Sequence, residues 1–222
     1  MFLHSPLREV AFELRFPPRL RVPAEIWRLQ DQLVQAYPEV GKEATMQATG
    51  AVSDVAVFQN SEERRVIKVS HSNFVIAFTR YVRFDDFKSE VLRQTEQFCG
   101  LFGIEEFSRI GLRYVNEIAL PNAEPLSKYL SPSLSFTSFP EELVDQFAVE
   151  VFAKYREHPM TVRSALLPGL VRTYVLDIDC HTSARSSAAE HPILLDRFHE
   201  SAQRVFLDHV TEEYKQVMRG RK

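Results

Sequence analysis

Glycine is scarce in this sequence, with only seven residues among 222. No Gly-x-x-x-x-Gly-Lys-Ser/Thr loop, no Gly-x-Gly-x-x-Gly fingerprint and no Gly-x-Ser-x-Gly elbow is present. Each of these motifs needs glycine where the backbone approaches a phosphate or turns sharply before a nucleophile. The sequence therefore excludes the nucleotide-binding and hydrolase chemistries that depend on these three motifs.

Cysteine is scarcer still, and long apolar runs are missing. Cys99 and Cys180 lie far apart, with no Cys-x-x-Cys or Cys/His spacing near either. We interpret both as small buried apolar side chains rather than a disulfide or a metal pair. No apolar run approaches the ~20 residues of a membrane-spanning helix, and the N-terminal residues do not resemble a signal peptide. We expect a protein of the reducing cytoplasm that does not cross a membrane.

Neither sign of charge dominates the composition. The chain holds 27 Lys and Arg against 30 Asp and Glu, which gives a formal net charge of −3. This balance argues against a protein that coats nucleic acid, although a local basic face remains compatible with it. The chain is 45% hydrophobic and contains 17 phenylalanines but one tryptophan. The composition predicts a globular protein with a core rich in phenylalanine.

A segment near the N-terminus is repeated later in the chain. Arg-Glu-Val-Ala-Phe-Glu-Leu-Arg-Phe at 8–16 is matched in altered form by Ser-Arg-Ile-Gly-Leu-Arg-Tyr-Val-Asn at 108–116. Similar patterns follow both copies. Because internal repeats at a constant offset are typical of duplicated architectures, we interpret the chain as a duplicated unit.

The first repeat predicts a strand, a helix, four strands and a second helix. Apolar residues alternate over 8–16, as in a strand with one buried face. Helical spacing follows over 23–37, between Pro23 and Pro38. It returns over 85–103, where Gly103 is expected just beyond the last turn. Between the helices we expect an antiparallel meander of four strands, at 43–49, 52–59, 64–71 and 73–82.

The second repeat predicts the same order of elements. A strand over 108–116 is followed by a shorter helix over 121–130. The next strand candidates are at about 134–138, 145–156, 160–166 and 170–181. A long helix over 192–218 closes the repeat. Its Leu195, Phe206 and Val210 match Phe87, Phe98 and Phe102 of the first repeat at one constant offset.

These elements predict an α+β fold built from tandem β-α-ββββ-α repeats. The repeats would form one curved antiparallel sheet with helices on one face, an arrangement that resembles the TATA-box-binding-protein-like fold. We expect a single domain over 1–222, made of repeats at about 6–103 and 104–218. Residues 219–222 form a basic tail, either a solvated helix end or a phosphate contact. The fold analogy does not transfer a function.

The outward side chains of the two first strands form one candidate site. The small residues Ala11 and Gly111 lie among charged neighbours there. The candidate ligand-binding residues are Glu13, Arg15, Arg109, Arg113 and Glu117. Since arginine forks suit planar oxyanions, a carboxylate, a phosphate or a peptide would fit a shallow floor between them. The alternative is a set of cross-strand ion pairs, such as Glu13 with Arg113, on a solvated sheet.

A second candidate site lies in the segment Val-Leu-Asp-Ile-Asp-Cys-His. Asp177, Asp179 and His181 alternate in it and would project from one face of a strand. Two carboxylates and an imidazole suit a divalent metal. No His-x-x-x-His or Glu-x-x-His motif accompanies them. The alternative is a set of ordinary residues on the exposed face of a strand.

Three motifs together resemble a known family. Pro-Leu-Arg-Glu-Val-Ala-Phe-Glu-Leu-Arg-Phe at 6–16, Arg-Ile-Gly-Leu-Arg-Tyr-Val-Asn at 109–116 and Leu-Asp-Ile-Asp at 176–179 are its features here. The chain resembles a sporadically distributed prokaryotic family of uncharacterised proteins of similar length, over nearly all its residues. The resemblance implies one intact domain, and it implies no activity, cofactor or catalytic residue.

These observations favour a non-enzymatic binding or adaptor protein. It would use an open sheet face or a sheet edge to hold a protein partner or an anionic ligand. One alternative is a metal-dependent enzyme on a phosphorylated or nucleotide substrate, with Asp177, Asp179 and His181 as ligands. Another is a nucleic-acid-binding module that uses Arg15, Arg109, Arg113 and the tail. No catalytic residue is predicted, and the cofactor and the oligomeric state stay open.

Overall fold

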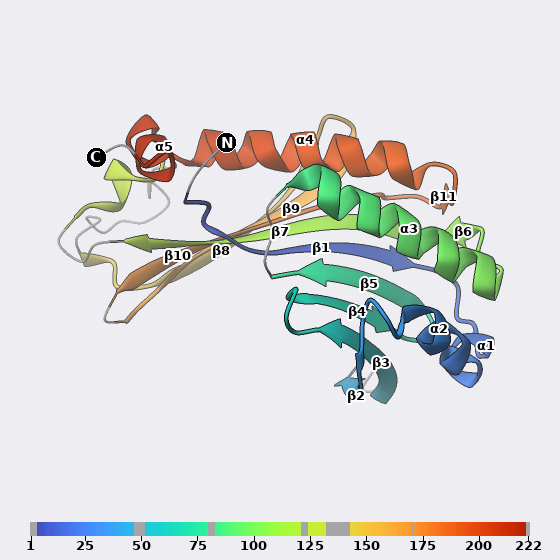
Figure 1. The fold of residues 1–222 in the computed structure, drawn as a ribbon. Coiled ribbons are helices and arrows are strands. Elements are labelled where there is room, and N and C mark those ends of the chain that lie inside the picture. The colour runs from blue at the N-terminus through green and yellow to red at the C-terminus, as the bar shows by residue number, and fades with distance from the viewer. Residues whose placement is uncertain are drawn as a thin grey trace. The chain divides into compact units, whose positions relative to one another are not determined.

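The computed structural model describes residues 4–46, 52–79, 83–120, 124–131, 143–169 and 171–220, and Figure 1 shows its helices and strands. The chain divides into two compact units. Unit 1 comprises Met1–Arg8, Arg113–Cys180 and Phe198–Lys222, and unit 2 comprises Glu9–Leu112 and His181–Arg197.

The helices and strands fall mainly in one unit or the other. Those of unit 2 are β1 (Leu7–Arg15), α1 (Arg21–Ala24), α2 (Ile26–Leu33), β2 (Glu39–Met46), β3 (Val52–Asn60), β4 (Arg65–Val69), β5 (Asn73–Phe78), α3 (Phe84–Phe102), β6 (Glu106–Phe107) and β11 (Ser186–Ser187). Those mainly in unit 1 are β7 (Arg109–Leu120), the 3-10 turn η1 (Leu126–Lys128), β8 (Phe147–Tyr155), β9 (His158–Leu167), β10 (Arg172–His181), α4 (His191–His209) and α5 (Glu212–Met218).

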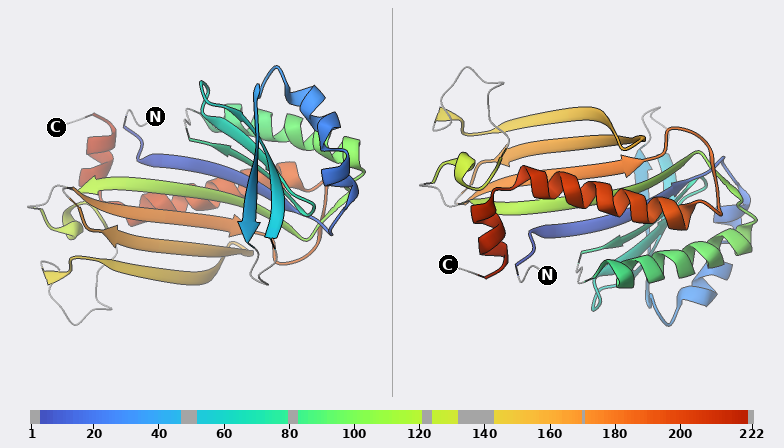
Figure 2. Two further views of the ribbon diagram at one scale, coloured as in Figure 1. Left: turned by 90° about the horizontal axis from the view of Figure 1, so that it is seen from below. Right: turned by 90° about the horizontal axis from the view of Figure 1, so that it is seen from above.

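The described strands form an open antiparallel sheet with helices. Nine strands follow the order β2-β3-β4-β5-β1-β7-β10-β9-β8, and β11 pairs with β6 in a separate two-stranded sheet. Consecutive strands from β2 to β5 pair with one another, so the predicted antiparallel meander is confirmed in unit 2. The mixed α+β class is confirmed as well (Figure 2).

The core of unit 2 consists of one face of its strands and the apolar stripe of α3. Alternation along β1 buries Val10, Phe12 and Leu14 completely, as the period of two predicted. The helix α3 lies along one side of these strands (Figures 1 and 2). Its Phe98 ring stacks on Phe74 of β5 with centroids 4.3 Å apart. Burying each such ring contributes roughly 1.5–3 kcal/mol, so this aromatic contact holds the helix to the sheet.

The end of α3 follows the predicted glycine cap. Gly103 has φ 64°, a left-handed conformation that glycine adopts without steric cost. Its N–H donates to the carbonyl of Cys99. The expected helix over 85–103 is confirmed, with its last helical residue at Phe102.

The first predicted helix is divided in two. The structure has α1 and α2 in place of one helix over 23–37, and Glu25 between them has φ −113° and ψ 19°. The carboxylate of Glu25 accepts hydrogen bonds from Arg21 and Arg28, which hold this junction. Leu29 and Leu33 are buried as the helical spacing predicted.

Unit 1 has a core of its own between strands and the second half of α4. Leu176 and Ile178 of β10 are fully buried, as is Phe198 of α4. The His158 ring meets Phe198 edge-on at 5.0 Å between centroids. These contacts explain why the strand expected over 170–181 forms, with bounds Arg172–His181.

The long C-terminal helix expected over 192–218 is interrupted. The structure has α4 and α5, and Thr211 between them accepts a hydrogen bond from the Tyr214 N–H through its side chain at 3.2 Å. Threonine is a favourable N-cap because its hydroxyl satisfies an N–H that the new helix leaves open. Val210 forms an isolated bridge with Leu130, which takes its backbone out of the helix.

The helix expected over 121–130 is wrong in its described part. Only Leu126–Lys128 is helical, as a single 3-10 turn. Pro125 ahead of it has ψ 149°, an extended conformation, and proline disfavours helical backbone in the residue before it. Residues 121–123 and the strand expected at 134–138 lie outside the described residues.

The hairpin between β8 and β9 provides a stability prediction. Tyr155 pairs with His158, and the two turn residues Arg156 and Glu157 have φ of 47° and 74°. Two positive φ values define a turn that strongly prefers Asn-Gly. We expect the double substitution Arg156→Asn, Glu157→Gly to raise the free energy of unfolding by about 1 kcal/mol in urea titrations, because it relieves left-handed strain. An unchanged or lower midpoint would contradict this.

Candidate functional site

In unit 2 the predicted sheet-face residues form a cluster around one carboxylate. Glu13 Oε1 accepts hydrogen bonds from Asn73 Nδ2 at 2.8 Å and from Arg15 Nε at 3.0 Å. Glu13 Oε2 accepts from Arg109 Nη1. The side chains of Glu13 and Arg109 are only 19% and 16% exposed. Three of the five predicted residues are thus brought together, in an arrangement that holds side chains in place.

The small residue Gly111 has a structural role beside this cluster. A Cβ added to Gly111 would lie 2.8 Å from Cζ of Arg109, so the guanidinium occupies the space above this backbone. Glycine lets the arginine side chain fold over the strand and reach Glu13. The shallow floor expected at Gly111 is therefore covered by Arg109.

In unit 1 a second cluster surrounds Asp177. Arg113 donates to both oxygens of this carboxylate, Nε to Oδ1 at 2.8 Å and Nη2 to Oδ2 at 2.9 Å. Arg163 Nη1 lies 3.3 Å from Oδ2, and its Nε lies 2.6 Å from Glu150. The Asp177 side chain is 6% exposed, whereas the two arginines are about half exposed, at 47% and 45%. Two guanidinium groups are thereby held over one buried carboxylate.

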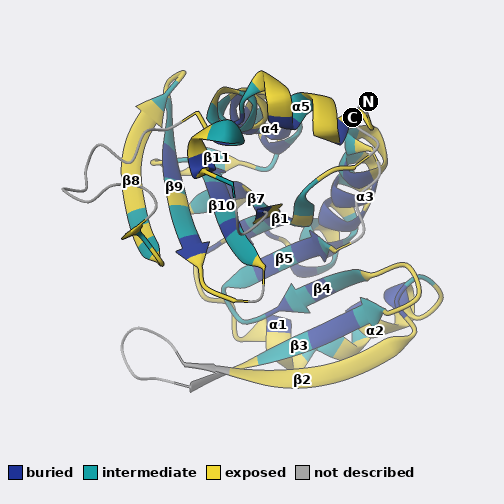
Figure 3. Cartoon of the chain, turned by 90° about the vertical axis from the view of Figure 1, so that its left-hand side faces the viewer, coloured by how far each residue is buried: buried dark blue, intermediate teal, exposed yellow. Residues whose placement is uncertain are grey.

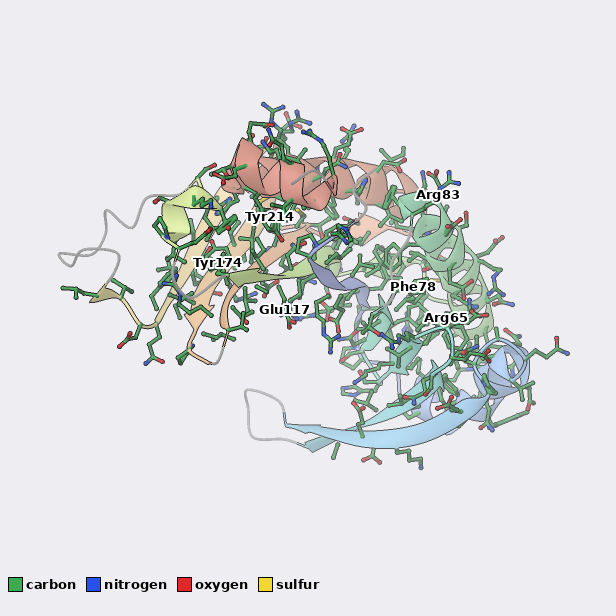
Figure 4. All side chains as sticks on the ribbon, turned by 60° about the vertical axis from the view of Figure 1, so that its left-hand side comes forward. Arg65, Phe78, Arg83, Glu117, Tyr174 and Tyr214 are labelled. Carbon is green, nitrogen blue, oxygen red and sulfur yellow. The ribbon has the colours of Figure 1, made fainter. Side chains whose placement is uncertain are left out.

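Glu117 is the remaining predicted residue of the sheet face. Its carboxylate lies 4.0 Å from Nε of Arg8, and both side chains are exposed. Glu117 is labelled in Figure 4. An exposed pair at this distance contributes at most ~1 kcal/mol. The ion pairs that the sequence suggested therefore exist, but Glu13 pairs with Arg109 and Arg113 pairs with Asp177.

The predicted metal ligands do not form a metal-binding group in the part of the chain that the structure describes. No cluster of three or more His, Cys, Asp or Glu that could hold an ion occurs there. Asp177 is engaged by arginines, and His181 Nδ1 lies 3.1 Å from the Thr182 carbonyl. Asp179 is half-buried beside Thr161 in the β9–β10 ladder. Metal binding by Asp177, Asp179 and His181 stays a prediction.

A buried polar network in unit 2 escaped the sequence analysis. Glu90 of α3 accepts from the Tyr37 hydroxyl at 2.8 Å and from Gln94 at 2.9 Å. Arg93 donates to its other oxygen at 2.6 Å. Burial alone would raise the pKa of Glu90, but the hydrogen bonds from Arg93, Gln94 and Tyr37 outweigh it and lower the pKa. Glu90 is therefore an ionised carboxylate in the core.

A pocket in unit 2 also escaped the sequence analysis. It measures 680 Å³ and lies between the second half of α3 and the segment that leads into α4. Its lining residues are Leu92, Thr95, Glu96, Cys99, Gly100, Gly103, Ile104, Glu105, Ala188, Ala189, His191 and Pro192. In the sequence, only Gly100 and Gly103 near the end of α3 hinted at this pocket, because residues 188–192 on its other side are distant in the chain.

The two cysteines are free thiols. Burial raises the pKa of both Cys99 and Cys180 to about 12, which keeps them protonated and unreactive near neutral pH. Cys180 is buried, as the sequence predicted, and Cys99 is half-buried beside the pocket. Neither thiol is poised as a nucleophile.

Comparison with known proteins identifies no family or relative from which a function follows. No protein-family model matches the chain, and no curated protein matches it significantly. Within the described ranges, none of the helices combines the length and the apolar character that crossing a bilayer requires.

Proposed function

We propose that this chain is a non-enzymatic binding protein that holds a protein partner along the edge of its sheet, at β8. The observation that carries the proposal is the exposure of apolar side chains on this last strand of the sheet. Phe152 is 75% exposed and Val151 is 50% exposed. Adjacent residues of a strand point to opposite faces, so both faces of β8 present apolar surface.

The backbone of β8 supports the same proposal. Its nine residues pair regularly with β9, from Phe147 with Leu166 to Tyr155 with His158. Among the described strands, β9 is the only neighbour of β8. A regularly paired strand with an open edge offers alternate N–H and C=O groups, to which an extended peptide adds as a further strand. Figure 3 shows β8 as largely exposed.

The strand at the other end of the order, β2, fits this role less well. Lys42 and Glu43 are exposed on it, and Glu43 pairs with Lys68 of β4 at 2.7 Å. Exposed charged residues occur on β8 as well, at Glu150 and Lys154, so the exposed apolar pair Val151 and Phe152 is what distinguishes the two edges. Val40 is exposed on β2, but its cross-strand partner Phe58 is buried, so the described part of β2 has no exposed aromatic side chain like Phe152.

The proposal includes the duplicated architecture and the cytoplasmic setting. Outward from β1 the strand order runs β5, β4, β3, β2, and outward from β7 it runs β10, β9, β8. Both orders run backward along the chain, with four strands outward from β1 and three described strands outward from β7. This shared direction supports a tandem repeat related to the TATA-box-binding-protein-like fold, in keeping with the family resemblance. The two free thiols support a reducing compartment.

An anionic ligand on the sheet face is a second candidate. The favouring observation is that Asp177 holds Arg113 and Arg163 in place while their side chains stay about half exposed. Pre-ordered guanidinium groups bind planar oxyanions with little further loss of entropy. Asp177 and Glu150 neutralise much of their charge, which is why the edge of the sheet is preferred. A metal-dependent enzyme and a nucleic-acid module have no comparable support among the described residues.

Photo-crosslinking tests the proposed edge. Phe152 is replaced by benzoylphenylalanine, the protein is expressed in its own host, and adducts are identified by mass spectrometry after irradiation. We expect one dominant protein adduct, because a strand added to β8 would lie within reach of residue 152. Tyr155 and His158 close a two-residue hairpin, so alternation along the ladder turns the N–H groups of residues 150, 152 and 154 toward the open edge. A second substitution, Glu150→Pro, removes one of these outward N–H groups and is expected to abolish the adduct.

Trp27 supplies the matched control. It is 58% exposed on α2, so benzoylphenylalanine at that position samples a similarly exposed aromatic site on a different element. An adduct of twice the chain mass would identify the partner as a second copy. The proposal fails if position 152 yields the same adducts as position 27, or none.

A further inference from the structure

The pocket beside α3 contains polar atoms that the fold leaves unsatisfied. Thr95 is 1% exposed and its Oγ1 has no hydrogen-bond partner. His191 is 9% exposed and its Nε2 has none either. Buried polar atoms are nearly always hydrogen-bonded, and an exception in a native protein often marks the place of a missing ligand or water. Both residues line the same pocket.

The chemistry of His191 defines what a ligand must supply. Its Nδ1 bonds to the carbonyl of Ala188, which can only accept, so Nδ1 carries the proton. Burial lowers the pKa of His191, which keeps the ring neutral near pH 7. Nε2 is then a lone-pair acceptor. A ligand that satisfies it must bring a donor.

The charged residues of the pocket point to the same kind of ligand. Glu96 and Glu105 are the charged residues among those that line it, and both are acidic. The C-terminal end of α3 and the N-terminal end of α4 both border the pocket, and their helix dipoles have opposite effects there. The two carboxylates therefore make the electrostatic potential of the pocket negative. Leu92, Ile104 and Pro192 supply apolar surface.

The absence of a side chain at Gly100 of α3 leaves space in the pocket. Gly100 lies inside α3, where glycine destabilises a helix by roughly 1 kcal/mol relative to alanine. A Cβ at Gly100 would meet nothing within 4 Å, so close packing does not explain the glycine. The volume of 680 Å³ is within the range of about 300–1,000 Å³ typical of small-molecule sites.

We infer that this pocket binds a small primary amine with an apolar body, whose N–H groups donate to His191 Nε2 and Thr95 Oγ1 and whose charge is balanced by Glu96 and Glu105. The site lies wholly in unit 2 and is independent of the partner proposed for β8.

Three matched probes test the ligand class. Phenethylamine, 2-phenylethanol and 3-phenylpropanoate share an aromatic body and differ in charge. Each is titrated at millimolar concentration into the ¹⁵N-labelled full chain, and the amide signals of Gly100 and Gly103 are followed. We expect the amine to bind about tenfold more tightly than the alcohol and the acid to bind most weakly, since the carboxylates favour a cation. Equal affinities for amine and acid, or no response to any probe, would overturn the inference.

Two variants locate the binding. Gly100→Trp fills the pocket from an exposed helix position and is expected to abolish binding of the amine, whereas Ser89→Trp on the same helix lies outside the lining and is expected to leave it unchanged. Thr95→Val keeps nearly the same shape and removes an unsatisfied hydroxyl, so it should not lower the thermal midpoint, yet it should weaken the amine about tenfold. Binding that survives Gly100→Trp would show that the amine occupies another site.

Discussion

Replacing Phe98 by alanine is expected to lower the free energy of unfolding by about 3–5 kcal/mol, the largest loss that we predict for one substitution. Phe98 is fully buried in unit 2. Its ring contacts Phe74, Phe102 and Phe16 at centroid distances of 4.3, 5.1 and 5.6 Å. Alanine would remove the ring from the centre of this group and leave a cavity that the rigid neighbours cannot fill.

Urea unfolding of Phe98→Ala beside Phe152→Ala measures this effect. Phe152 is 75% exposed, so the same change there is expected to stay within about 0.5 kcal/mol. The pair of variants separates burial from residue type. Native domains have about 5–15 kcal/mol of net stability, so the Phe98 variant would lose a large share of it. A loss below about 1 kcal/mol would show that the α3 stripe does not hold the sheet.

Replacing Glu90 by alanine is expected to cost about 3 kcal/mol. Glu90 accepts hydrogen bonds from the buried Tyr37 hydroxyl and from Gln94, and it balances Arg93 and Arg65 (Arg65 is labelled in Figure 4). Alanine would leave the first two donors buried without an acceptor, and breaking a buried network from one side is costly. Glu96→Ala on the exposed face of α3 is the control, with a change within about 0.5 kcal/mol expected in urea titrations.

The pH dependence of stability provides an independent check on Glu90. Its folded pKa lies below the ordinary value of 4.5, so the unfolded chain takes up its proton first as the pH falls. The stabilisation from the ionised network is complete above about pH 4.5 and is lost as the pH falls through the folded pKa. Wild type should therefore lose more stability than Glu90→Ala between pH 6 and roughly pH 3. Parallel loss in both proteins would mean that Glu90 is not ionised in the core.

Local patterns predicted the elements that have a full period of apolar residues. The alternation of Val10, Phe12 and Leu14 predicted β1, and the stripe with Phe98 predicted α3 up to its cap at Gly103. Such periods reflect one buried face, which a sequence records directly. The predictions failed where a single residue ends a helix that the spacing of apolar residues predicts to continue. Thr211 caps a new helix inside the expected C-terminal one, and Pro125 reduces an expected helix to one turn.

The candidate sites show the same division. The sequence placed acids and arginines on the two central strands, but it did not reveal which of them pair. Glu13 reaches Arg109 because Gly111 leaves space for that guanidinium, and Asp177 is engaged by Arg113 and Arg163 from neighbouring strands. Strand register and side-chain direction determine which residues pair, and the spacing of residues in the sequence predicts neither.

By itself the sequence determined the α+β class, the antiparallel meander and the faces that strands and helices bury, because these follow from periodicity and turn residues. Only the tertiary structure decided the Tyr37–Glu90 network, the exposed strand β8 and the pocket that joins α3 to His191. The network and the pocket depend on segments that are distant in the chain and are brought together by folding. The exposure of β8 depends on its place at the end of the strand order, with β9 as its only described neighbour. A linear sequence specifies neither which distant residues meet nor which strand lies at the edge.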